Sequence, residues 1–249
     1  MTSKLRRSTM EADKTTLHNN AEAIRAEFKD YAYSVSHDLS APVRAMVEFS
    51  RLLTTEHADT LNDEGKEFLS LIIENGEKLQ EMMDGLLAYS RLNTMAKPFC
   101  EVSPSRIVED CRTILEKQIL ISGTEIHVSE MPTIKADTEQ LMQVFHALID
   151  NGIKFQPKEN KPIINISAEE KDGAWQFAVT DNGIGIDPKY QEKVYRLFQR
   201  LHTDDEYPGI GIGLTLAKKI VQRHGGNIWY EPNPDQGITS YFTVPVQLP

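Results

Sequence analysis

The chain has 249 residues, a formal net charge of −10 at pH 7 and 40% hydrophobic residues, a composition typical of soluble globular proteins. The acidic balance argues against nonspecific nucleic-acid binding and against a basic membrane patch. The sequence has two cysteines, no apolar run of membrane-spanning length and no signal-peptide core. We therefore expect a cytoplasmic protein without disulfides, or a soluble part of a larger protein, with one large domain or two small ones.

The amino-terminal third predicts a long helix over about residues 12–55. From Leu17 to Val35 the apolar residues recur at spacings of four and three, which is the pattern of a heptad seam. The same register resumes at Pro42, Ala45, Phe49 and Leu52. A seam of this kind predicts that the helix packs against other helices.

The stretch "SHDLSAP" within this helix places His37 beside Asp38 and ends at Pro42. His37 lies two positions after the seam, so its side chain is predicted to face solvent. Because Pro42 has no N–H group, the carbonyl of Asp38 loses its helical partner, and we expect a kink there.

A second amphipathic helix, with apolar residues from Phe68 to Leu87, is predicted to run to about Leu92. The two helices form a hairpin, and a lone hairpin cannot bury both of its apolar faces. Dimerisation into a four-helix bundle is the expected solution. The alternative is an intramolecular coiled coil that docks on the rest of the chain. The stretch "NTMAKPFCEVSP" then reads as a linker.

After the linker the pattern changes to mixed helices and strands. Residues 105–119 and 137–155 predict helices by their three- and four-residue spacing. Alternation and β-branched residues predict strands at 124–129, 163–170, 175–181, 226–232 and 240–246. Helices on one face of a mixed sheet would make residues 100–249 an α/β sandwich.

Two polar motifs carry candidate chemistry. In "ALIDNGIKF", Asn151 and Lys154 share a helix face, where an amide oxygen can bind Mg²⁺ and an ammonium can meet phosphate. In "VTDNGIGID", Asp181 ends a strand before Gly183 and Gly185, so a carboxylate able to accept from an exocyclic amine precedes a flexible turn. A polar helix face and a plain turn are the respective alternatives.

A third motif, "YPGIGIGLTLAKKIV", places Gly209, Gly211 and Gly213 before a helix that begins near Leu214. Free N–H groups and a helix N-terminus form an anion site there, although a flexible hinge is the alternative. The preceding "RLFQRLHTDDEYPG" is polar, with Phe198 as an apolar anchor. It could close over a nucleotide and exclude water, or be an ordinary surface loop.

In this order the motifs resemble the catalytic core of a two-component sensor histidine kinase. "SHDLSAP" resembles the phospho-acceptor box, "LIDNGIKF" the N box, "DNGIGI" the G1 box, Phe198 the F box and "GIGIGL" the G2 box. "FQRLHTDDEYPG" and "IVQRHGGNIWYEP" are most similar to the kinase modules of bacterial phytochromes. The resemblance covers residues 25–247.

The resemblance implies an α+β protein: a helical hairpin that forms a dimeric four-helix bundle, then a Bergerat-type ATP-binding sandwich. The implied domains are a coiled-coil lead-in (1–27), a dimerisation and phospho-acceptor domain (28–96) and a catalytic ATP-binding domain (97–249). The implied partners are a second copy, a response-regulator receiver domain and an upstream sensor domain or sensor partner. By resemblance, the regulator is expected to dock on the face around Val43, Met46 and Val47.

The resemblance also implies site roles. His37 is the phosphorylated residue, Asp38 holds its ring and accepts its proton, and Lys154 completes the catalytic set. Asn151 is the implied ligand of Mg²⁺, and Asp181 is the carboxylate that reads adenine. The implied ATP-binding residues are Asn151, Lys154, Asp181, Gly183, Gly185, Phe198, Gly209, Gly211, Gly213 and Leu214.

The sequence departs from the family pattern at four positions. Ala147 replaces a polar N-box residue, Ser40 replaces an Arg, and Ile210 stands where the G2 box often has Thr or Ser. Ala41 stands where phosphatase-competent members often carry Thr or Asn, which predicts weak phosphatase activity. These departures leave open a degenerate kinase that acts as a phosphotransfer scaffold. A gyrase-like or chaperone-like ATPase is a third possibility, but it does not account for a histidine-bearing hairpin.

Overall fold

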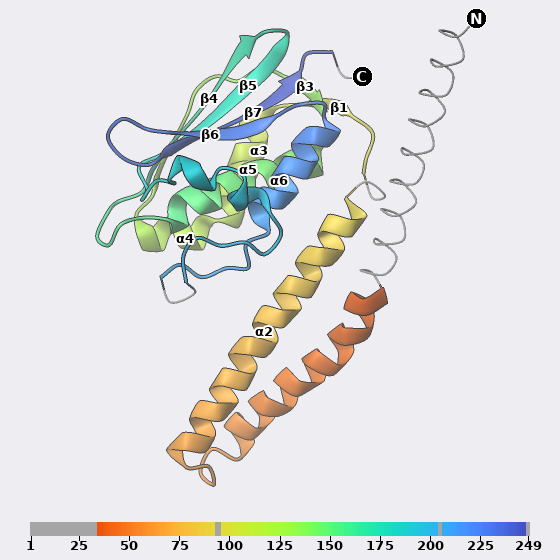
Figure 1. Cartoon of the computed structure of the whole chain (residues 1–249), viewed down its shortest axis with the longest axis vertical. Helices are drawn as coiled ribbons and strands as arrows, with labels where there is room; N and C mark the ends of the chain where they lie inside the picture. Colours follow the sequence, from red (N-terminus) through yellow and green to blue (C-terminus); the bar gives the residue numbers. More distant parts are fainter. Residues whose placement is uncertain (1–33, 93–95, 204–205, 248–249) are drawn as a thin grey trace, which may run out of the picture. The chain divides into compact units, whose positions relative to one another are not determined.

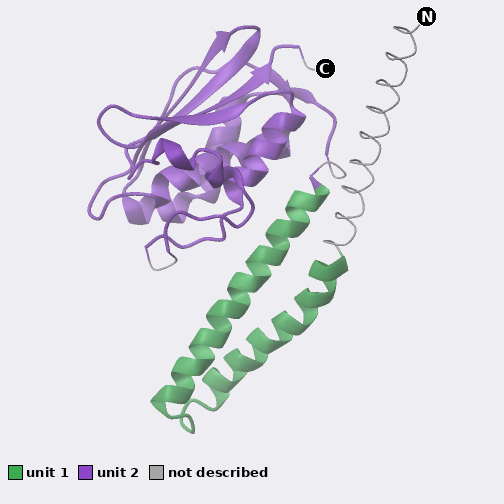
Figure 2. Cartoon of the chain, in the orientation of Figure 1, with its two compact units in different colours: residues 1–91 green, residues 92–249 purple. Residues whose placement is uncertain are grey.

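The computed structural model describes residues 34–92, 96–203 and 206–247 (Figure 1). The chain divides into two compact units, Met1–Arg91 and Leu92–Pro249 (Figure 2). The predicted coiled-coil lead-in, residues 1–27, lies outside the described residues, and so does the seam before residue 34. The three domain boundaries stay a prediction.

The first unit is the predicted helical hairpin. Its first helix is described over residues 34–56 and continues without interruption through Pro42, and α2 spans Asp63–Arg91. The two helices lie side by side and antiparallel (Figure 1). A side chain at Gly76 of α2 would overlap Val47, so this glycine lets the helices approach closely.

Within the single chain, the predicted seam does not form the contact between the two helices of the hairpin. Within the described residues of the first helix, the partly or fully buried side chains are those of Val35, Ser36, Ser40, Val43, Val47, Ser50 and Thr54. The predicted seam residues Phe49 and Leu52 are instead 66% and 46% exposed. Small side chains pack inside the hairpin because they allow the helices to come close, which leaves the large apolar residues outside.

This register corrects one expectation and agrees with another. Val43 and Val47 are buried at 4% and 2% exposure, so the predicted docking face around Val43, Met46 and Val47 keeps only Met46 on the surface. His37 follows the buried Ser36, and its side chain is 72% exposed, as predicted.

The second unit contains a five-stranded mixed sheet. Its strands, in sheet order, are β2 (Glu125–Val128), β4 (Ile163–Lys171), β5 (Ala174–Asp181), β7 (Ile238–Pro245) and β6 (Ile228–Pro232). β2 pairs with β4 in parallel, and the other neighbours are antiparallel. All five strands agree with the predicted ones.

Helices cover one face of this sheet, as predicted (Figure 1). They are α3 (Pro104–Ile114), α4 (Glu116–Ser122), α5 (Thr138–Lys154) and α6 (Gly213–Arg223). Phe145 of α5 packs edge-on against Phe177 of β5 and Phe242 of β7, with ring centroids 5.7 and 5.3 Å away. All three rings are fully buried, so α5 is anchored in the centre of the core.

Some short elements were not predicted. The single helix expected over residues 105–119 is two helices, because the chain breaks at Leu115, whose side chain is buried in the core. The short strands β1 (Cys100–Val102) and β3 (Ile134–Ala136) pair as a second, two-stranded sheet. Two 3₁₀ turns, η1 (Pro188–Tyr190) and η2 (Lys193–Tyr195), precede the glycine motif. Three-residue elements are too short to show a period.

Candidate functional site

The candidate acceptor lies on the exposed side of the hairpin. Nδ1 of His37 is 3.2 Å from Oδ1 of Asp38, and both side chains are largely exposed. When Asp38 accepts a hydrogen bond from Nδ1–H, the neutral ring carries its lone pair on Nε2. The pair therefore has the arrangement of a nucleophilic imidazole oriented by a carboxylate.

The candidate base-reading carboxylate lies at the end of β5. Oδ1 of Asp181 accepts the backbone N–H groups of Gly183, at 2.9 Å, and Ile238, at 3.4 Å. No described residue donates to Oδ2, so this oxygen can accept a hydrogen bond from a ligand. Burial raises the pKa of Asp181 to about 6, and the two backbone bonds oppose that rise.

Two glycines bring the end of α5 against this carboxylate. A side chain at Gly152 would come 3.3 Å from Cβ of Asp181, and one at Gly183 would overlap the carbonyl of Phe155. That carbonyl also accepts the N–H of Ile184 at 3.0 Å. The polar end of α5 and the turn after β5 therefore form one continuous wall.

The turn before β7 packs against the main-chain carbonyl of Asp181. Gly237 has φ +85° and lies so close to the carbonyl of Asp181 that any side chain would overlap it. Asn233 donates its Nδ2–H to that carbonyl at 2.9 Å, and Gly185 faces Gly237 across the turn. Sequence reasoning missed Gly152, Asn233 and Gly237. The turn signal "NPDQG" could have pointed to the last two.

Lys154 connects the N-box motif to the glycine motif that precedes α6. A side chain at Gly209 would come 2.6 Å from its Nζ, so the ammonium lies directly against the glycine backbone. Burial lowers the pKa of Lys154, and the charge of Arg200 adds to this, whereas Asp150 opposes it. A partly desolvated ammonium at this place is suited to meet a phosphate group.

Each of the three glycines of that motif has its own structural role. Gly209 and Gly211 have φ +136° and +73°, conformations that side chains disfavour. The carbonyl of Gly211 accepts the N–H of Phe198 at 3.1 Å. Gly213 opens α6 and contacts Ala147, since a Cβ added to it would lie 3.4 Å from that of Ala147.

The start of α6 fits an anion. Its N-cap residue, Ile212, has no side chain that can accept a hydrogen bond, so the first N–H groups of the helix lack a side-chain cap. Leu214 packs its side chain on the core, which leaves its backbone N–H for a ligand. An uncapped N-terminus beside a lysine provides the donors that a polyphosphate needs.

The segment between the glycine motifs folds against the end of α5. Phe198 has φ +58°, and Tyr207 donates its hydroxyl to the carbonyl of Gln156 at 2.9 Å. The ring of Tyr207 lies 5.2 Å from that of Phe155. The described part of this segment therefore packs against the end of α5.

The residues also fit a magnesium ion that is held mainly by a substrate. The side chain of Asn151, on the last turn of α5, is half-buried and makes no hydrogen bond to the described residues. Within those residues, no group of three His, Cys, Asp or Glu side chains could form a metal cage. Mg²⁺ commonly takes one or two protein oxygens together with substrate phosphates.

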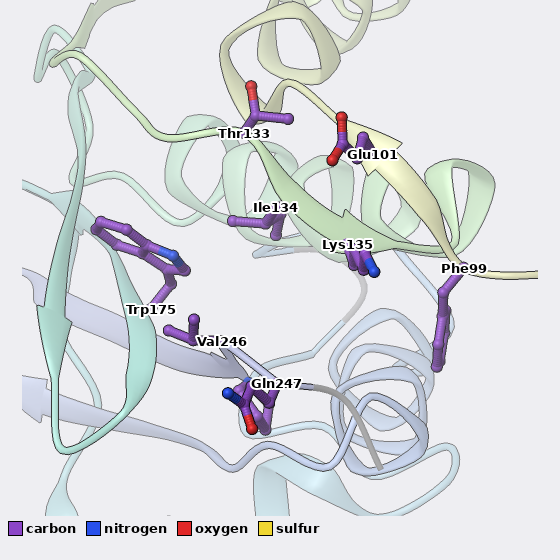
Figure 3. Close-up of a pocket in the computed structure, with 9 residues that line it drawn as sticks. Phe99, Glu101, Thr133, Ile134, Lys135, Trp175, Val246 and Gln247 are labelled. Atoms are coloured by element: carbon purple, nitrogen blue, oxygen red, sulfur yellow. The ribbon is translucent and has the colours of Figure 1, made fainter.

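A groove of about 500 Å³ lies elsewhere in the second unit (Figure 3). Its lining includes Phe99, Lys135 and Ile134 from the β1–β3 side and Trp175 and Val246 from the end of the larger sheet. None of the predicted site residues lines it.

The predicted site residues thus fall into two groups. His37 and Asp38 lie on the hairpin, while Asn151, Lys154, Asp181 and the glycines converge at one end of the sandwich. An ATP-binding sandwich that follows a hairpin with an exposed histidine is the arrangement of the histidine kinases.

Two family models match the chain. The His Kinase A (phospho-acceptor) domain matches residues 29–94, and the histidine kinase-, DNA gyrase B- and HSP90-like ATPase domain matches residues 136–248. Together they account for most of the chain. The chain carries the catalytic core of a sensor histidine kinase, a phospho-acceptor domain followed by an ATP-binding domain.

Individual relatives agree with this family. The phytochrome-like protein Cph1 of Synechocystis sp. is 40% identical over 230 residues, which cover 92% of this chain and 31% of that protein. Cyanobacterial phytochrome A of Nostoc sp. is also 40% identical, over 92% of this chain and 30% of that protein. The chain therefore spans about a third of the length of these relatives.

A solved structure shares the fold. The crystal structure of full-length ShkA in complex with AMPPNP superposes with a TM-score of 0.66 at 23% identity, covering 88% of this chain and 46% of that one. Among the residues that the structure describes, no helix has both the length and the apolar character needed to span a bilayer.

Proposed function

We propose that this core transfers the γ-phosphoryl group of Mg²⁺-bound ATP to Nε2 of His37 and then to an aspartate of a response-regulator receiver domain. The observation that carries the proposal is the convergence of Asp181, Lys154 and the uncapped start of α6 at one end of the sandwich. A carboxylate, an ammonium and free N–H groups match the adenine and phosphate ends of ATP. The related ShkA structure holds AMPPNP.

Each nucleotide-binding residue has a separate task in this proposal. Oδ2 of Asp181 accepts a hydrogen bond from the exocyclic amine of adenine. Lys154 and the N–H groups of Gly213 and Leu214 neutralise phosphate charge, and Asn151 would hold the Mg²⁺ that shares it. The glycines let the backbone come close, and the segment around Phe198 excludes water.

His37 is the proposed nucleophile. The lone pair of Nε2 forms the N–P bond while the bond from phosphorus to the bridging oxygen breaks, and its electron pair leaves on ADP. As positive charge develops on the ring, Asp38 accepts the Nδ1–H proton, and it returns this proton to Nδ1 when the N–P bond breaks in the second step. In the second step an aspartate carboxylate attacks phosphorus, and the N–P electron pair returns to Nε2.

A dimer is part of the proposal because the hairpin leaves much of its apolar surface exposed. The exposed large apolar residues of its two helices include Phe49, Leu52, Leu53, Phe68, Leu71, Ile72 and Leu79. Exposed apolar stripes on both helices are what a second hairpin would cover in a four-helix bundle. Cytoplasmic location and an upstream sensor are further parts of the proposal, which rest on family resemblance.

The degenerate-scaffold alternative rests on Ala147 and Ile210. Ala147 contacts Gly213, so it closes the space between α5 and α6 with two small residues. Against this alternative, the carboxylate of Asp181 and the ammonium of Lys154 keep an arrangement suited to a nucleotide. We therefore favour the active kinase.

The test is transfer of labelled γ-phosphate from ATP in the presence of Mg²⁺, comparing the unmodified chain with His37→Gln. Acid-labile, base-stable label on the unmodified chain and none on the variant supports the kinase. Bound nucleotide without label on either protein would favour the scaffold instead. Loss of nucleotide binding in both would contradict the proposed site itself.

A further inference from the structure

A buried carboxylate joins three segments of the second unit at the end opposite the nucleotide site. Asp137 is 1% exposed and caps α5, since its Oδ1 accepts the N–H of Gln140 at 3.2 Å. Its Oδ2 accepts the backbone N–H of Lys97 at 2.7 Å and lies 3.3 Å from Nη1 of Arg223. One side chain therefore ties the start of α5 to the end of α6 and to the segment 96–99 that leads into β1.

Arg223 strengthens the same junction. It donates from Nη1 to Oε1 of Gln140 at 2.8 Å and from Nη2 to the carbonyl of Lys97 at 3.0 Å. Its guanidinium carbon lies 4.6 Å from the centroid of the Phe99 ring. A planar guanidinium with several fixed acceptors holds its partners in one orientation, which an ammonium cannot reproduce.

His224 completes the junction in its neutral form. Its Nε2 accepts the N–H of Asp137 at 3.1 Å, so Nδ1 carries the hydrogen and donates to the carbonyl of Ile220 at 2.8 Å. The ring of Phe99 lies 4.7 Å away. Lys97 and Phe99 are thus held by hydrogen bonds, a cation–π contact and ring packing together.

The same two helices carry the proposed nucleotide-binding groups at their other ends. α5 begins beside Asp137 and ends with Asn151 and Lys154, and α6 begins at Gly213 and ends with Arg223. At about 1.5 Å per residue, α6 spans roughly 16 Å. A change in the angle between these helices therefore shifts the positions of the groups at both of their ends.

We propose that Asp137, Arg223 and His224 form a linker clamp, which positions residues 97–99 and couples them energetically to the nucleotide site. The inference rests on the proposed function, because the clamp acts by fixing how the chain from the acceptor hairpin enters the ATP-binding domain. Coupling between two sites is reciprocal. Bound nucleotide must therefore tighten the clamp by the same factor by which an intact clamp raises nucleotide affinity.

Hydrogen exchange at the Lys97 amide tests the coupling without any phosphoryl transfer, because this N–H donates to Asp137. In the unmodified chain, addition of AMPPNP with Mg²⁺ is expected to slow that exchange by about threefold or more. Exchange at Lys97 that does not respond to saturating AMPPNP would overturn the coupling.

Kinetics of His37 labelling provide the second measurement. Arg223→Lys keeps a positive charge next to Asp137 but removes the planar guanidinium with its several donors. Phe99→Leu removes the ring and leaves the ion pair between Asp137 and Arg223 intact. Neither variant therefore leaves Asp137 unpaired. We expect each to lower the maximal labelling rate by about fivefold, because fewer linker orientations are productive. By reciprocity, each should also lower nucleotide affinity by about the factor by which AMPPNP slows Lys97 exchange. Arg106→Lys, on the exposed face of α3, is the matched control and should change neither quantity.

The two proposals fail in different ways. If AMPPNP binds and slows exchange at Lys97 but His37 is never labelled, the clamp proposal stands and the kinase proposal is contradicted. If His37 is labelled at the same rate in the unmodified chain, in Arg223→Lys and in Phe99→Leu, the kinase proposal stands and the clamp proposal is contradicted. A lower affinity for nucleotide with an unchanged maximal rate would also contradict the clamp, since it would show a merely structural role.

Discussion

The two units of this chain treat their apolar residues in opposite ways. In the sandwich, Phe145, Phe177 and Phe242 are fully buried and pack ring against ring. In the hairpin, Val47 and small residues fill the contact between the helices, and Phe49 is 66% exposed. The sandwich is complete as a single chain, whereas the hairpin has surface left for a partner.

This difference separates two kinds of dependence on assembly. A complete core can bind its ligand as a monomer, because its site is built from contacts within one chain. A hairpin with an exposed apolar face gains stability only when that face is covered. The nucleotide site should therefore tolerate loss of the dimer, while the acceptor histidine should depend on it.

The largest expected effect is on nucleotide binding by the sandwich. Asp181→Asn replaces an acceptor that faces the ligand with an amide that can present N–H groups to the adenine amine. We expect affinity for ATP analogues to fall by about 100-fold, the cost of an unmade hydrogen bond to a charged group plus a repulsive contact. Isothermal titration calorimetry measures this.

Asp172→Asn is the matched control, since Asp172 lies in the exposed turn between β4 and β5 and has φ +52° that Asn also tolerates. Equal affinities for the Asp181 variant and the unmodified chain would remove Asp181 from the site.

A substitution on the hairpin should weaken the dimer and leave nucleotide binding unchanged. Phe49→Ser removes the most exposed large apolar side chain of the described part of the hairpin. The dimer should weaken by about 30-fold, as expected for the loss of one well-buried aromatic from an interface core. Nucleotide affinity should not change.

Analytical ultracentrifugation measures the dimer, and Leu120→Ser, at a 74% exposed position of α4, is the control. A dimer weakened equally by both variants would place the interface outside the hairpin.

The same contrast explains how far the sequence could predict the structure. Strands such as β5 alternate clearly because one face is buried within the chain, and the sequence predicts Asp181, at the end of that strand, as a site residue. Phe49 and Leu52 have the predicted spacing of a seam but do not lie inside the single-chain hairpin, because smaller residues fill the contact between its two helices.

The contacts missed in the site are long-range ones. Gly152 and Gly237 lie against Asp181, from α5 and from the turn before β7. The sequence around Gly237 indicates a turn, but it does not indicate which residue that turn approaches. The junction of Asp137 with Arg223 joins residues 86 positions apart. Local patterns predict elements, but which residues meet depends on how the helices cross the sheet.

A smaller effect is expected where a glycine leaves room for Lys154. Gly209→Ala puts a methyl group 2.6 Å from Nζ and adds strain at φ +136°. Displacement of the ammonium should lower nucleotide affinity by about tenfold. Gly173→Ala, also at positive φ but with no atom within 4 Å of the added carbon, controls for backbone strain. Equal losses in both variants would assign the effect to strain alone.

The smallest effect follows from the titration of Asp181. Its folded pKa, about 6, lies above the unfolded value of 3.8, so the ionised carboxylate costs stability above pH 6 and that cost is relieved as pH falls toward 4. In the proposed function, however, adenine recognition needs the ionised form. Affinity for AMPPNP should therefore fall by about fivefold between pH 7 and pH 5.5, while the sandwich gains stability from this group over the same range. Titrations across that range, with Asp181→Asn as the reference that lacks the carboxylate, separate the two effects. A pH-independent affinity would mean that the carboxylate does not contact the ligand.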